Sequence, residues 1–327
     1  MQNRKKLHGN AIINALMSPE ISILIPLIVL CIYTGVTKPA FLATKNLQII
    51  VRYSAFIGVL ALGQAFALMT GEIDLSIGTN SMLCSIVFTE LAINVGWAPW
   101  LSIAMGIVTG AVVGYANAFF SFRLNISSWI VTLSMQYICK GVATVISKGL
   151  VIHSLEGGFV AFSKARPLGM TWMLWIAVAL FVIAEVVTRF TPVGRIVHAV
   201  GISSDASRIA GINVRRVKTL CMMFAGTMAG VCGVLQSIST LSGSPATGIG
   251  NEFPAIICCA IGGVSTSGGK GTLLGTMIGV LMYQTLKNCL QLLGLENNYQ
   301  LVFTGVILVL AVCFDILKSK MQFRAAR

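Results

Sequence analysis

The sequence predicts an all-α, polytopic membrane protein of about ten transmembrane helices, two of them interrupted by glycines, with both chain termini in the cytoplasm. Composition is the first observation behind this prediction: 56% of the 327 residues are apolar, 10% are charged, and the mean hydropathy is +0.87. A water-soluble domain cannot bury so large an apolar fraction. The other two observations are the lengths of the uncharged runs and the positions of the basic residues.

Uncharged runs long enough to cross a bilayer recur along the whole chain. A spanning helix requires about 20 mostly apolar residues. The runs without Asp, Glu, Lys or Arg are residues 21–37, 53–71, 91–122, 124–139, 167–184, 219–251, 253–269, 271–286 and 297–314, and residues 75–89 form a further apolar stretch. The longest polar interval, 189–218, is too short for a hydrophobic core of its own. Residues 1–327 are therefore predicted to form a single transmembrane domain.

Basic residues gather in three clusters, which predicts the orientation because Lys and Arg near span ends accumulate on the cytoplasmic side. The clusters are Arg4, Lys5 and Lys6; Arg189, Arg195, Arg208, Arg215, Arg216 and Lys218; and Lys318, Lys320, Arg324 and Arg327. Both termini and the loop at about 189–218 are thus predicted to be cytoplasmic, with roughly six spans before the loop and four after it. Lys38, Lys45 and Arg52 oppose this bias without reversing it. The same rule accounts for the net charge of +13, so no nucleic-acid partner is inferred.

The stretch TGEIDLSIG, residues 70–78, joins two apolar segments and is the first predicted interruption of a span. Ionisable side chains inside a bilayer are costly and usually face a cavity, a partner or a helix break. Glu72, Asp74 and Ser76 are therefore candidates for lining a polar pathway. A second interpretation of Asp74 is that its carboxylate only caps the following half-helix. Glu72 is less easily explained as a cap.

The loop from Thr191 to Lys218 is predicted to contain a short helix in its middle. Ser203, Ser204 or Asp205 would cap that helix, and Gly211 would end it. Its apolar face would consist of Ala206, Ile209 and Ala210, and the glycines expected to separate short segments are Gly194, Gly201 and Gly211. Because Ile209, Ala210 and Ile212 would otherwise be exposed apolar residues in a basic loop, docking of a soluble partner is favoured over a solvated connector.

GGVSTSGGKGT, residues 262–272, is rich in glycine and contains one lysine, as a phosphate-binding P-loop does. The P-loop pattern G-x-x-x-x-G-K-[ST] is not met, since Val264 takes the place of the first glycine and Gly271 follows Lys270 where a hydroxyl residue is needed. ATP binding is therefore not predicted. The stretch is expected to be a second break in a membrane helix, because glycines also permit such breaks.

The two interruptions share the pattern G-x-x-x-x-S-x-G. A shift of 191 positions lays Gly71, Ser76 and Gly78 over Gly262, Ser267 and Gly269. Paired Gly-interrupted segments in two halves of a chain are typical of transporters with internal repeats, and they make Ser267 a further candidate for the pathway. Chance recurrence of small residues is the alternative. A repeat with this spacing would be parallel rather than inverted, because an even number of spans separates the two stretches.

Metal and cofactor sites are not predicted. The nine cysteines are scattered through apolar segments without a C-x-x-C pair, and the chain has three histidines. This pattern argues against disulfides, zinc and haem, and it favours cysteines that fill space in helix packing.

Three stretches resemble, in order and spacing, the permease subunits of bacterial ABC importers for ribose and related sugars: TGEIDLSIG, GRIVHAVGISSDASRIAGINVRRVK and GNEFPAIICCAIGGVSTSGGKGTLLGT. The resemblance extends from the first span to Asp315. It implies a homodimeric channel for a sugar or similar solute in the bacterial inner membrane, served by a separate ATP-binding subunit and a periplasmic solute-binding protein. No catalysis is expected in this chain. Pairing with a homologous permease instead of a second copy remains an alternative.

The same resemblance implies that the 189–218 loop contacts the ATPase. The coupling residues would be Gly194, Arg195, Asp205, Ala206, Arg208, Ile209, Ala210 and Gly211. Two departures from the family pattern stand out. Glu72 occupies a position where such permeases commonly have glycine, which leaves the solute open, and Ile202-Ser203-Ser204 replaces a Gly-Asn-containing run, which leaves the identity of the ATPase open.

Two other classes of function are considered. An ion-coupled secondary carrier would also have many spans and broken helices, with Glu72 or Asp74 as ion sites, but the coupling-type loop argues against it. A membrane enzyme would require a nucleophile or a metal constellation near one face, and no clustered set of His, Cys or acidic residues supplies one.

Overall fold

The computed structural model describes residues 19–296, 298–310 and 313. The helices before the long loop are α2 (Pro19–Thr37), α3 (Thr44–Met69), α4 (Ile77–Thr89), α5 (Pro99–Arg123), α6 (Ser128–Ser147), α7 (Gly158–Lys164) and α8 (Trp172–Phe190). The loop contains α9 (Pro192–Ile202) and α10 (Ser204–Ile209), and it is followed by α11 (Val214–Thr240), α12 (Glu252–Ile261), α13 (Leu273–Leu292) and a helix at Asn298–Leu310. The short elements are η1 (Pro39–Leu42), η2 (Glu90–Asn94), η3 (Pro167–Gly169), β1 (Ile152–His153) and β2 (Ser242–Gly243).

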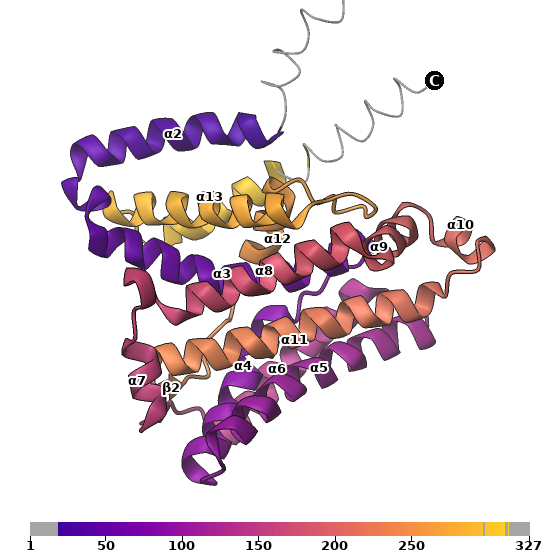
Figure 1. The fold of residues 1–327 in the computed structure, drawn as a ribbon, viewed down its shortest axis with the longest axis horizontal. Helices are drawn as coiled ribbons and strands as arrows, with labels where there is room; N and C mark the ends of the chain where they lie inside the picture. Colours follow the sequence, from indigo (N-terminus) through magenta and orange to yellow (C-terminus); the bar gives the residue numbers. More distant parts are fainter. Residues whose placement is uncertain (1–18, 297, 311–312, 314–327) are drawn as a thin grey trace, which may run out of the picture.

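The long helices run side by side across Figure 1. At one end lie α9 and α10, which we call the loop end; at the other lie α7 and the antiparallel pair β1–β2, which we call the strand end. In the described part of the chain, five helices are long and apolar enough to span a membrane, namely α3, α5, α6, α8 and α11. The prediction of an all-α polytopic membrane protein is thus confirmed, whereas the number of spans and the side on which the termini lie stay predictions.

The direction of each helix follows from its contacts with α11 and α13. The thiol of Cys232 on α11 donates to the Phe56 carbonyl oxygen at 3.4 Å, and Lys218 at the other end of α11 reaches Glu72 just beyond α3, so α3 and α11 are antiparallel. Helix α4 runs parallel to α11, because Ser81 and Ser85 of α4 lie beside Gly233 and Ser237 of α11 in the same order. Consecutive helices α3 and α4 therefore run in opposite directions.

The helices after the loop also reverse. Gly262 lies beside Gly275 and Cys258 beside Gly279, so α12 and α13 are antiparallel. The amide groups of Asn46 on α3 and Asn288 on α13 exchange hydrogen bonds of 2.9 and 2.8 Å. Since Gly58 of α3 lies against Val280, α13 runs opposite to α3.

The helices form two units, α3–α4–α5 and α11–α12–α13. The units have the same order of long and short helices but run in opposite directions. Each consists of a long helix, a short helix of 13 or 10 residues and another long helix. The offset of 191 positions pairs α3–α4 with α12–α13, and these helices do share orientation as predicted, because α12 is antiparallel to α13 and α13 is antiparallel to α3. The units that match in the order and length of three helices are a different pairing, and they are inverted. The shared pattern G-x-x-x-x-S-x-G marks two reversals of the chain, and tight reversals need glycine and short polar residues wherever they occur.

The two predicted interruptions are confirmed as non-helical, but each joins two antiparallel helices and does not break one span. Residues 70–76 connect α3 to α4, and residues 262–272 connect α12 to α13. The shortened helices of the bundle are α4 and α12, which are entered through the irregular segments 71–76 and 241–251. The uncharged run 219–251, expected as a span, is therefore α11 plus such an entry segment.

Glycines hold α5 and α11 at close distance. Gly106, Gly110 and Gly114 are spaced one turn apart on α5 and face Gly226 and Gly230 on α11. A Cβ atom on Gly110 would overlap the carbonyl oxygen of Gly226, and one on Gly226 would overlap that of Gly110. This small-xxx-small spacing is the usual device for tight helix packing in lipid, where apolar surface alone does not drive association. The sequence analysis missed it, although the spacing is readable.

Gly110→Leu is expected to abolish recovery of folded protein, because the new side chain would have to displace backbone and would cost more than the about 1–3 kcal/mol typical of core overpacking. Size-exclusion chromatography of the detergent-extracted protein measures this. Gly305→Leu is the matched control, since no atom lies within 4 Å of a Cβ built there. Equal yields of monodisperse protein from both variants would contradict the packing argument.

Candidate functional sites in the bundle and the long loop

A buried polar layer surrounds the start of α4. Asp74 is fully buried, and one of its carboxylate oxygens accepts from the Ser76 N–H at 2.8 Å and from the Ser76 hydroxyl at 2.6 Å. Asn117 of α5 donates to the same hydroxyl at 2.9 Å. The other Asp74 oxygen has no hydrogen-bond partner in the part of the chain that the structure describes. The carboxylate thus lies just before a helix start, where it can stabilise the helix and also offers a free acceptor, so both interpretations of Asp74 stay open.

A second carboxylate, Glu252, lies where the N-termini of α4 and α12 meet. Glu252 is 3% exposed, and Gln136 of α6 donates to one of its oxygens at 2.9 Å. Its other oxygen packs directly against Gly78 and has no partner among the described residues. Two helix N-termini place partial positive charge around this carboxylate. The sequence analysis missed Glu252, whose signal was that it alone separates the uncharged runs 219–251 and 253–269.

The exposed surface of α6 carries a lysine and other polar residues among apolar side chains such as Ile138 and Val145. Lys140 is exposed, together with Ser134, Tyr137 and Thr144 at helical spacing. Lys140 lies about two turns before the end of α6, and side chains on a helix lean toward its N-terminus. The ammonium group is therefore directed toward the middle of the span and away from the nearer membrane surface.

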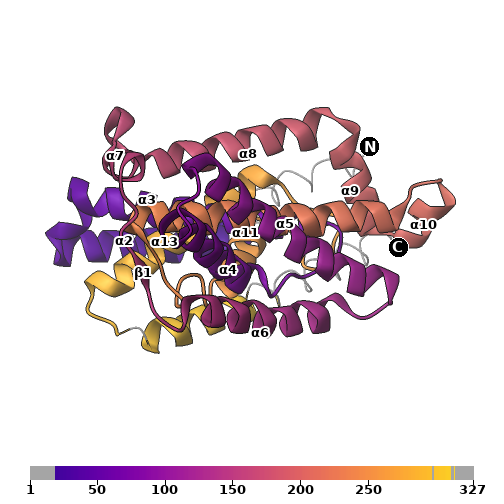
Figure 2. The same ribbon diagram turned by 90° about the horizontal axis from the view of Figure 1, so that it is seen from below.

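Helix α8 provides the comparison, because it lies on the opposite side of the bundle from α6 (Figure 2). Its large exposed side chains are apolar, with Val182 at 56%, Ile183 at 61% and Val186 at 48%. Such a surface suits lipid, whereas a lysine inside a span usually faces a partner or a water-filled cavity. Lys140 is therefore the feature that distinguishes the exposed surface of α6 from that of α8.

Glu72 is separated from this buried layer and lies at the loop end. Its carboxylate accepts from the Lys218 ammonium group at 2.7 Å, and the two side chains are 12% and 19% exposed. Lys218 also lies 5.9 Å from the centre of the Phe122 ring. Ser267 is exposed, and its backbone is close to Gly71. The four predicted pathway residues thus form two groups, with Asp74 and Ser76 inside the bundle and Glu72 and Ser267 at its loop end.

The Glu72–Lys218 pair is expected to stabilise the link between the α3–α4 reversal and α11. Glu72→Ala and Lys218→Ala should each lower the unfolding temperature, because either change leaves a partly buried charge unpaired. The double variant should recover part of the loss, with a coupling free energy of about 0.5–3 kcal/mol. Thermal unfolding of the four proteins in one detergent measures it. Strictly additive effects would show that the pair contributes nothing.

Helix α9 rests directly on both chain reversals. The Gly269 N–H donates to the Met69 carbonyl oxygen at 2.9 Å, and a Cβ atom on Gly201 would overlap both of these groups. A Cβ on Gly268 would lie 3.0 Å from Gly71 and 2.9 Å from the Gly201 carbonyl oxygen. The end of α9 and the two glycine-rich reversals therefore form one compact junction of the two inverted units.

The expectation that Gly194 and Gly201 separate short segments of the loop is wrong. Both glycines lie inside α9. Their missing side chains allow close packing, and Gly194 lies directly against the Thr188 carbonyl group. The start of α9 is set by Pro192 and by the Thr191 hydroxyl, which accepts from the Val193 N–H at 3.2 Å. Residue type alone does not distinguish a glycine used for packing from one used for a turn.

The short helix predicted in the middle of the loop is confirmed as α10. Of its three candidate caps, Ser203 fills the role, with its hydroxyl accepting from the Ala206 N–H at 3.2 Å, and Gly211 follows with a φ of +83°. Ile209 is 89% exposed. Asp205 and Arg208 form a loose, exposed pair at 3.8 Å. The loop end thus has an exposed isoleucine on a short capped helix.

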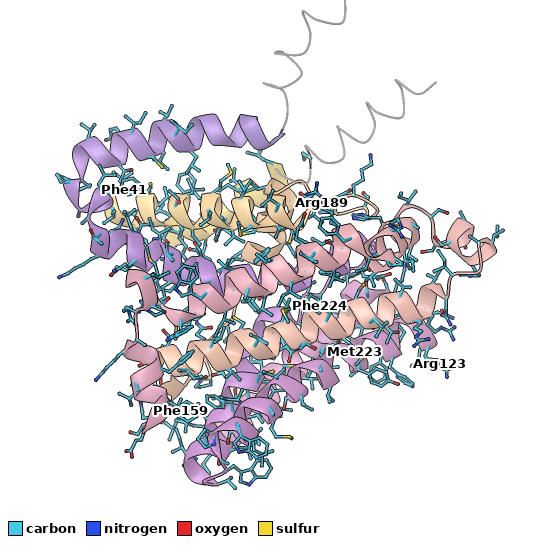
Figure 3. The ribbon with its side chains drawn as sticks, in the orientation of Figure 1. Phe41, Arg123, Phe159, Arg189, Met223 and Phe224 are labelled. Carbon is cyan, nitrogen blue, oxygen red and sulfur yellow. The ribbon has the colours of Figure 1, made fainter. Side chains whose placement is uncertain are left out.

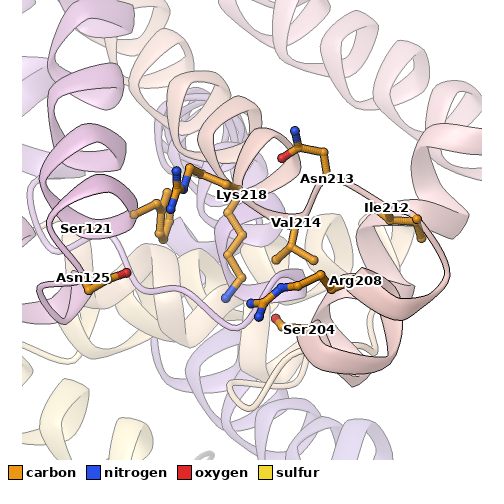
Figure 4. A pocket seen from close by; sticks show the side chains of 11 residues that line it. Ser121, Asn125, Ser204, Arg208, Ile212, Asn213, Val214 and Lys218 are labelled. Carbon is orange, nitrogen blue, oxygen red and sulfur yellow. The ribbon is translucent and has the colours of Figure 1, made fainter.

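A cavity of about 720 Å³ opens beside α10, between the ends of α5 and α11 (Figure 4). Its cationic lining residues are Arg208, Arg215 and Lys218, and Asn125, Ser204 and Asn213 add polar groups. A soluble partner that carries acidic and apolar groups would fit this surface together with Ile209.

No group of three His, Cys, Asp or Glu side chains that could hold a metal ion is found in the described ranges. The nine cysteines are free thiols, and seven of them are buried. Their burial agrees with the prediction that they fill space between helices.

These features define a class of protein: a polytopic membrane protein built from two inverted units around a buried polar layer, with a long loop that packs on their junction. The chain belongs to the family described as "Branched-chain amino acid transport system / permease component", whose pattern matches residues 46–312. It is a multi-pass inner-membrane permease.

Among its relatives, the ribose import permease protein RbsC of Bacillus subtilis is 34% identical over 295 residues, covering 90% of this chain and 91% of the relative. The L-arabinose ABC transporter permease protein AraH of Azospirillum brasilense is 33% identical and covers 86% and 83% of the two chains. RbsC of Escherichia coli K12 is 32% identical, with 89% and 92% covered. No solved structure matches the chain. The resemblance to sugar ABC permeases is confirmed, and these relatives lend no support to the ion-coupled carrier.

Proposed function

We propose that this chain is the translocation subunit of an ABC importer for a pentose or a similar small polar solute. A periplasmic binding protein would deliver the solute, and a separate ATPase subunit would supply the energy. The relatives named for ribose and L-arabinose support the solute class. The observation that carries the mechanism is the contact of α9 with both chain reversals.

That contact supports a coupling role for the loop at 189–218. A partner that grips α10 at Ile209 would pull on α9, and α9 touches the α3–α4 reversal at Met69 and the α12–α13 reversal at Gly269. Close packing transmits small displacements, and here the backbone of α9 at Gly201 lies so close to both reversals that no space remains between them. Movement of the loop would therefore act on both inverted units together and change how their short helices meet at Glu252.

The path itself would follow the polar side chains between these helices and the exposed face of α6. Asp74 and Ser76 belong to the buried layer, and Glu252 and Gln136 connect it to α6. A second copy of the chain facing α6 would enclose Lys140 in an aqueous path and remove it from lipid. One copy alone leaves Lys140 uncovered, so we propose a homodimer in which residues 1–327 of each copy act as one permease domain.

This chain would perform no catalysis. In the glycine-rich stretch 262–272, the Gly269 N–H is directed to the Met69 carbonyl oxygen, whereas a P-loop directs such groups to phosphate. The stretch is packed as part of the junction, which supports placing ATP hydrolysis on a separate subunit.

The test is reconstitution in proteoliposomes with the cognate ATPase subunit and binding protein. Uptake of radiolabelled ribose and L-arabinose is expected to require ATP inside, both partner proteins and this chain, and to persist when uncouplers remove ion gradients. Uptake by this chain alone, driven by a proton or sodium gradient, would refute the proposal and support the carrier.

A further inference from the structure

A groove between α5 and α11 at the loop end combines features that the transport mechanism does not use. It has a volume of about 320 Å³ and lies between the last turns of α5 and the first turns of α11. Three arginines line it, Arg123 from the end of α5 and Arg215 and Arg216 from the start of α11. Figure 3 shows Arg123 at the loop end of the bundle.

The three arginines lack acidic partners. Within residues 19–296, 298–310 and 313, no carboxylate lies within 4.0 Å of any of their guanidinium groups. All three are exposed, and the N-terminus of α11, capped by Asn213, adds partial positive charge beside them. Clustered guanidinium groups repel one another, and their planar, multiple donors match the oxygens of a phosphate or a carboxylate group.

The wall of the groove becomes apolar toward the middle of the bundle. Tyr115 and Phe119 of α5 are 51% and 41% exposed, with ring centres 6.5 Å apart, and Leu220 of α11 is 56% exposed. Tyr115 lies two turns from Arg123, about 12 Å deeper along the helix. Because α5 and α11 are helices of membrane-spanning length, these side chains lie at the depth of acyl chains.

We infer that this groove is a binding site for an anionic phospholipid of the cytoplasmic leaflet. The arginines bind the phosphate of the headgroup, and the aromatic wall packs against an acyl chain. The order of the lining, cationic outside and apolar inside, matches an amphiphile and matches neither a free phosphate ion nor an acidic protein surface. The groove shares Phe122, Asn213 and Arg215 with the cavity beside α10, so a bound lipid would adjoin the loop.

Native mass spectrometry of the purified chain tests this inference. Dioleoyl phosphatidylglycerol is expected to be retained in preference to dioleoyl phosphatidylcholine. The double variant Arg123→Gln, Arg216→Gln should bind phosphatidylglycerol roughly thirtyfold more weakly, since each charge near an anionic headgroup contributes about a fivefold factor in affinity. The matched control Arg189→Gln, Arg195→Gln removes the same charge elsewhere at the loop end and should retain the lipid as the unmodified chain does.

Three outcomes would overturn the inference. The first is equal retention of the two lipids, or unchanged retention in the groove variant. The second is displacement of phosphatidylglycerol by inorganic phosphate at matched concentration, which would show an anion site without a lipid. The third is loss of ATPase association by the groove variant with lipid retention unchanged, which would show a protein contact.

A measurement on the unmodified chain covers the case in which the variant fails to fold. A phosphatidylglycerol analogue with a photoreactive acyl chain should crosslink to the peptides that contain Phe119 and Leu220, and excess phosphatidylglycerol should suppress the labelling. Labelling of α8 to the same extent would indicate bulk lipid contact and contradict a site in the groove.

Discussion

Ile209→Asp is expected to abolish solute uptake while leaving the membrane-embedded fold intact. Ile209 is 89% exposed at the tip of α10, so the bundle does not need it, and a partner that buries it would have to desolvate the new carboxylate without a counter-charge. Loss of this contact would disconnect the ATPase from α9 and from both chain reversals. Pull-down of the ATPase subunit and ATP-driven uptake in proteoliposomes measure the two effects, and each should fall at least about tenfold, because burying an unpaired polar group costs more than about 1.4 kcal/mol.

Ile209→Met is the matched control, since it keeps an apolar side chain of similar size, and it should retain both activities. Ala206→Asp with Ala210→Asp extends the test to the exposed alanines within α10 and directly after it. Normal ATPase association and uptake in the Ile209→Asp variant would leave α10 as a solvated connector, and the importer mechanism would lose its coupling element.

Lys140→Met is expected to reduce uptake more than tenfold without loss of folded protein, because it removes a charge from the proposed path between two copies of α6. A position of Lys140 facing lipid predicts a different result. If Lys140 faced lipid, the change would remove a charge costing about 2.5 kcal/mol at the centre of a span, so the protein should become more stable and uptake should not change. Uptake and thermal unfolding of the same preparation distinguish the two placements.

The matched control is Val182→Met on the exposed face of α8, which should leave both stability and uptake unchanged. Engineered cysteines add a direct measure of the partner. Thr144→Cys should form a disulfide between copies under mild oxidation, and Val186→Cys on α8 should not. A crosslink through α8 with none through α6 would contradict the proposed dimer face.

Local signals made several features predictable. Hydropathy identified the membrane class, the glycine-rich stretches at 70–78 and 262–272 located two non-helical connections, and Ser203 with Gly211 bounded α10. The failed P-loop pattern argued against nucleotide binding. The inferences about membrane class, chain connections and the ends of α10 succeed because membrane insertion, chain reversal and helix capping depend on residues that are neighbours in sequence.

Sequence alone therefore determined that this chain lies in a membrane, where two of its non-helical connections lie and that its long loop contains a short capped helix. Only the tertiary structure decided that the two units are inverted, that Glu72 pairs with Lys218 and that Gln136 reaches Glu252. Those partners are 146 and 116 positions apart, so no local pattern relates them. The same holds for Gly110 and Gly201, whose missing side chains matter only because another backbone occupies the space. Contacts of this kind depend on how helices of similar composition stack, and hydropathy, which is nearly uniform along such helices, carries no information about their neighbours.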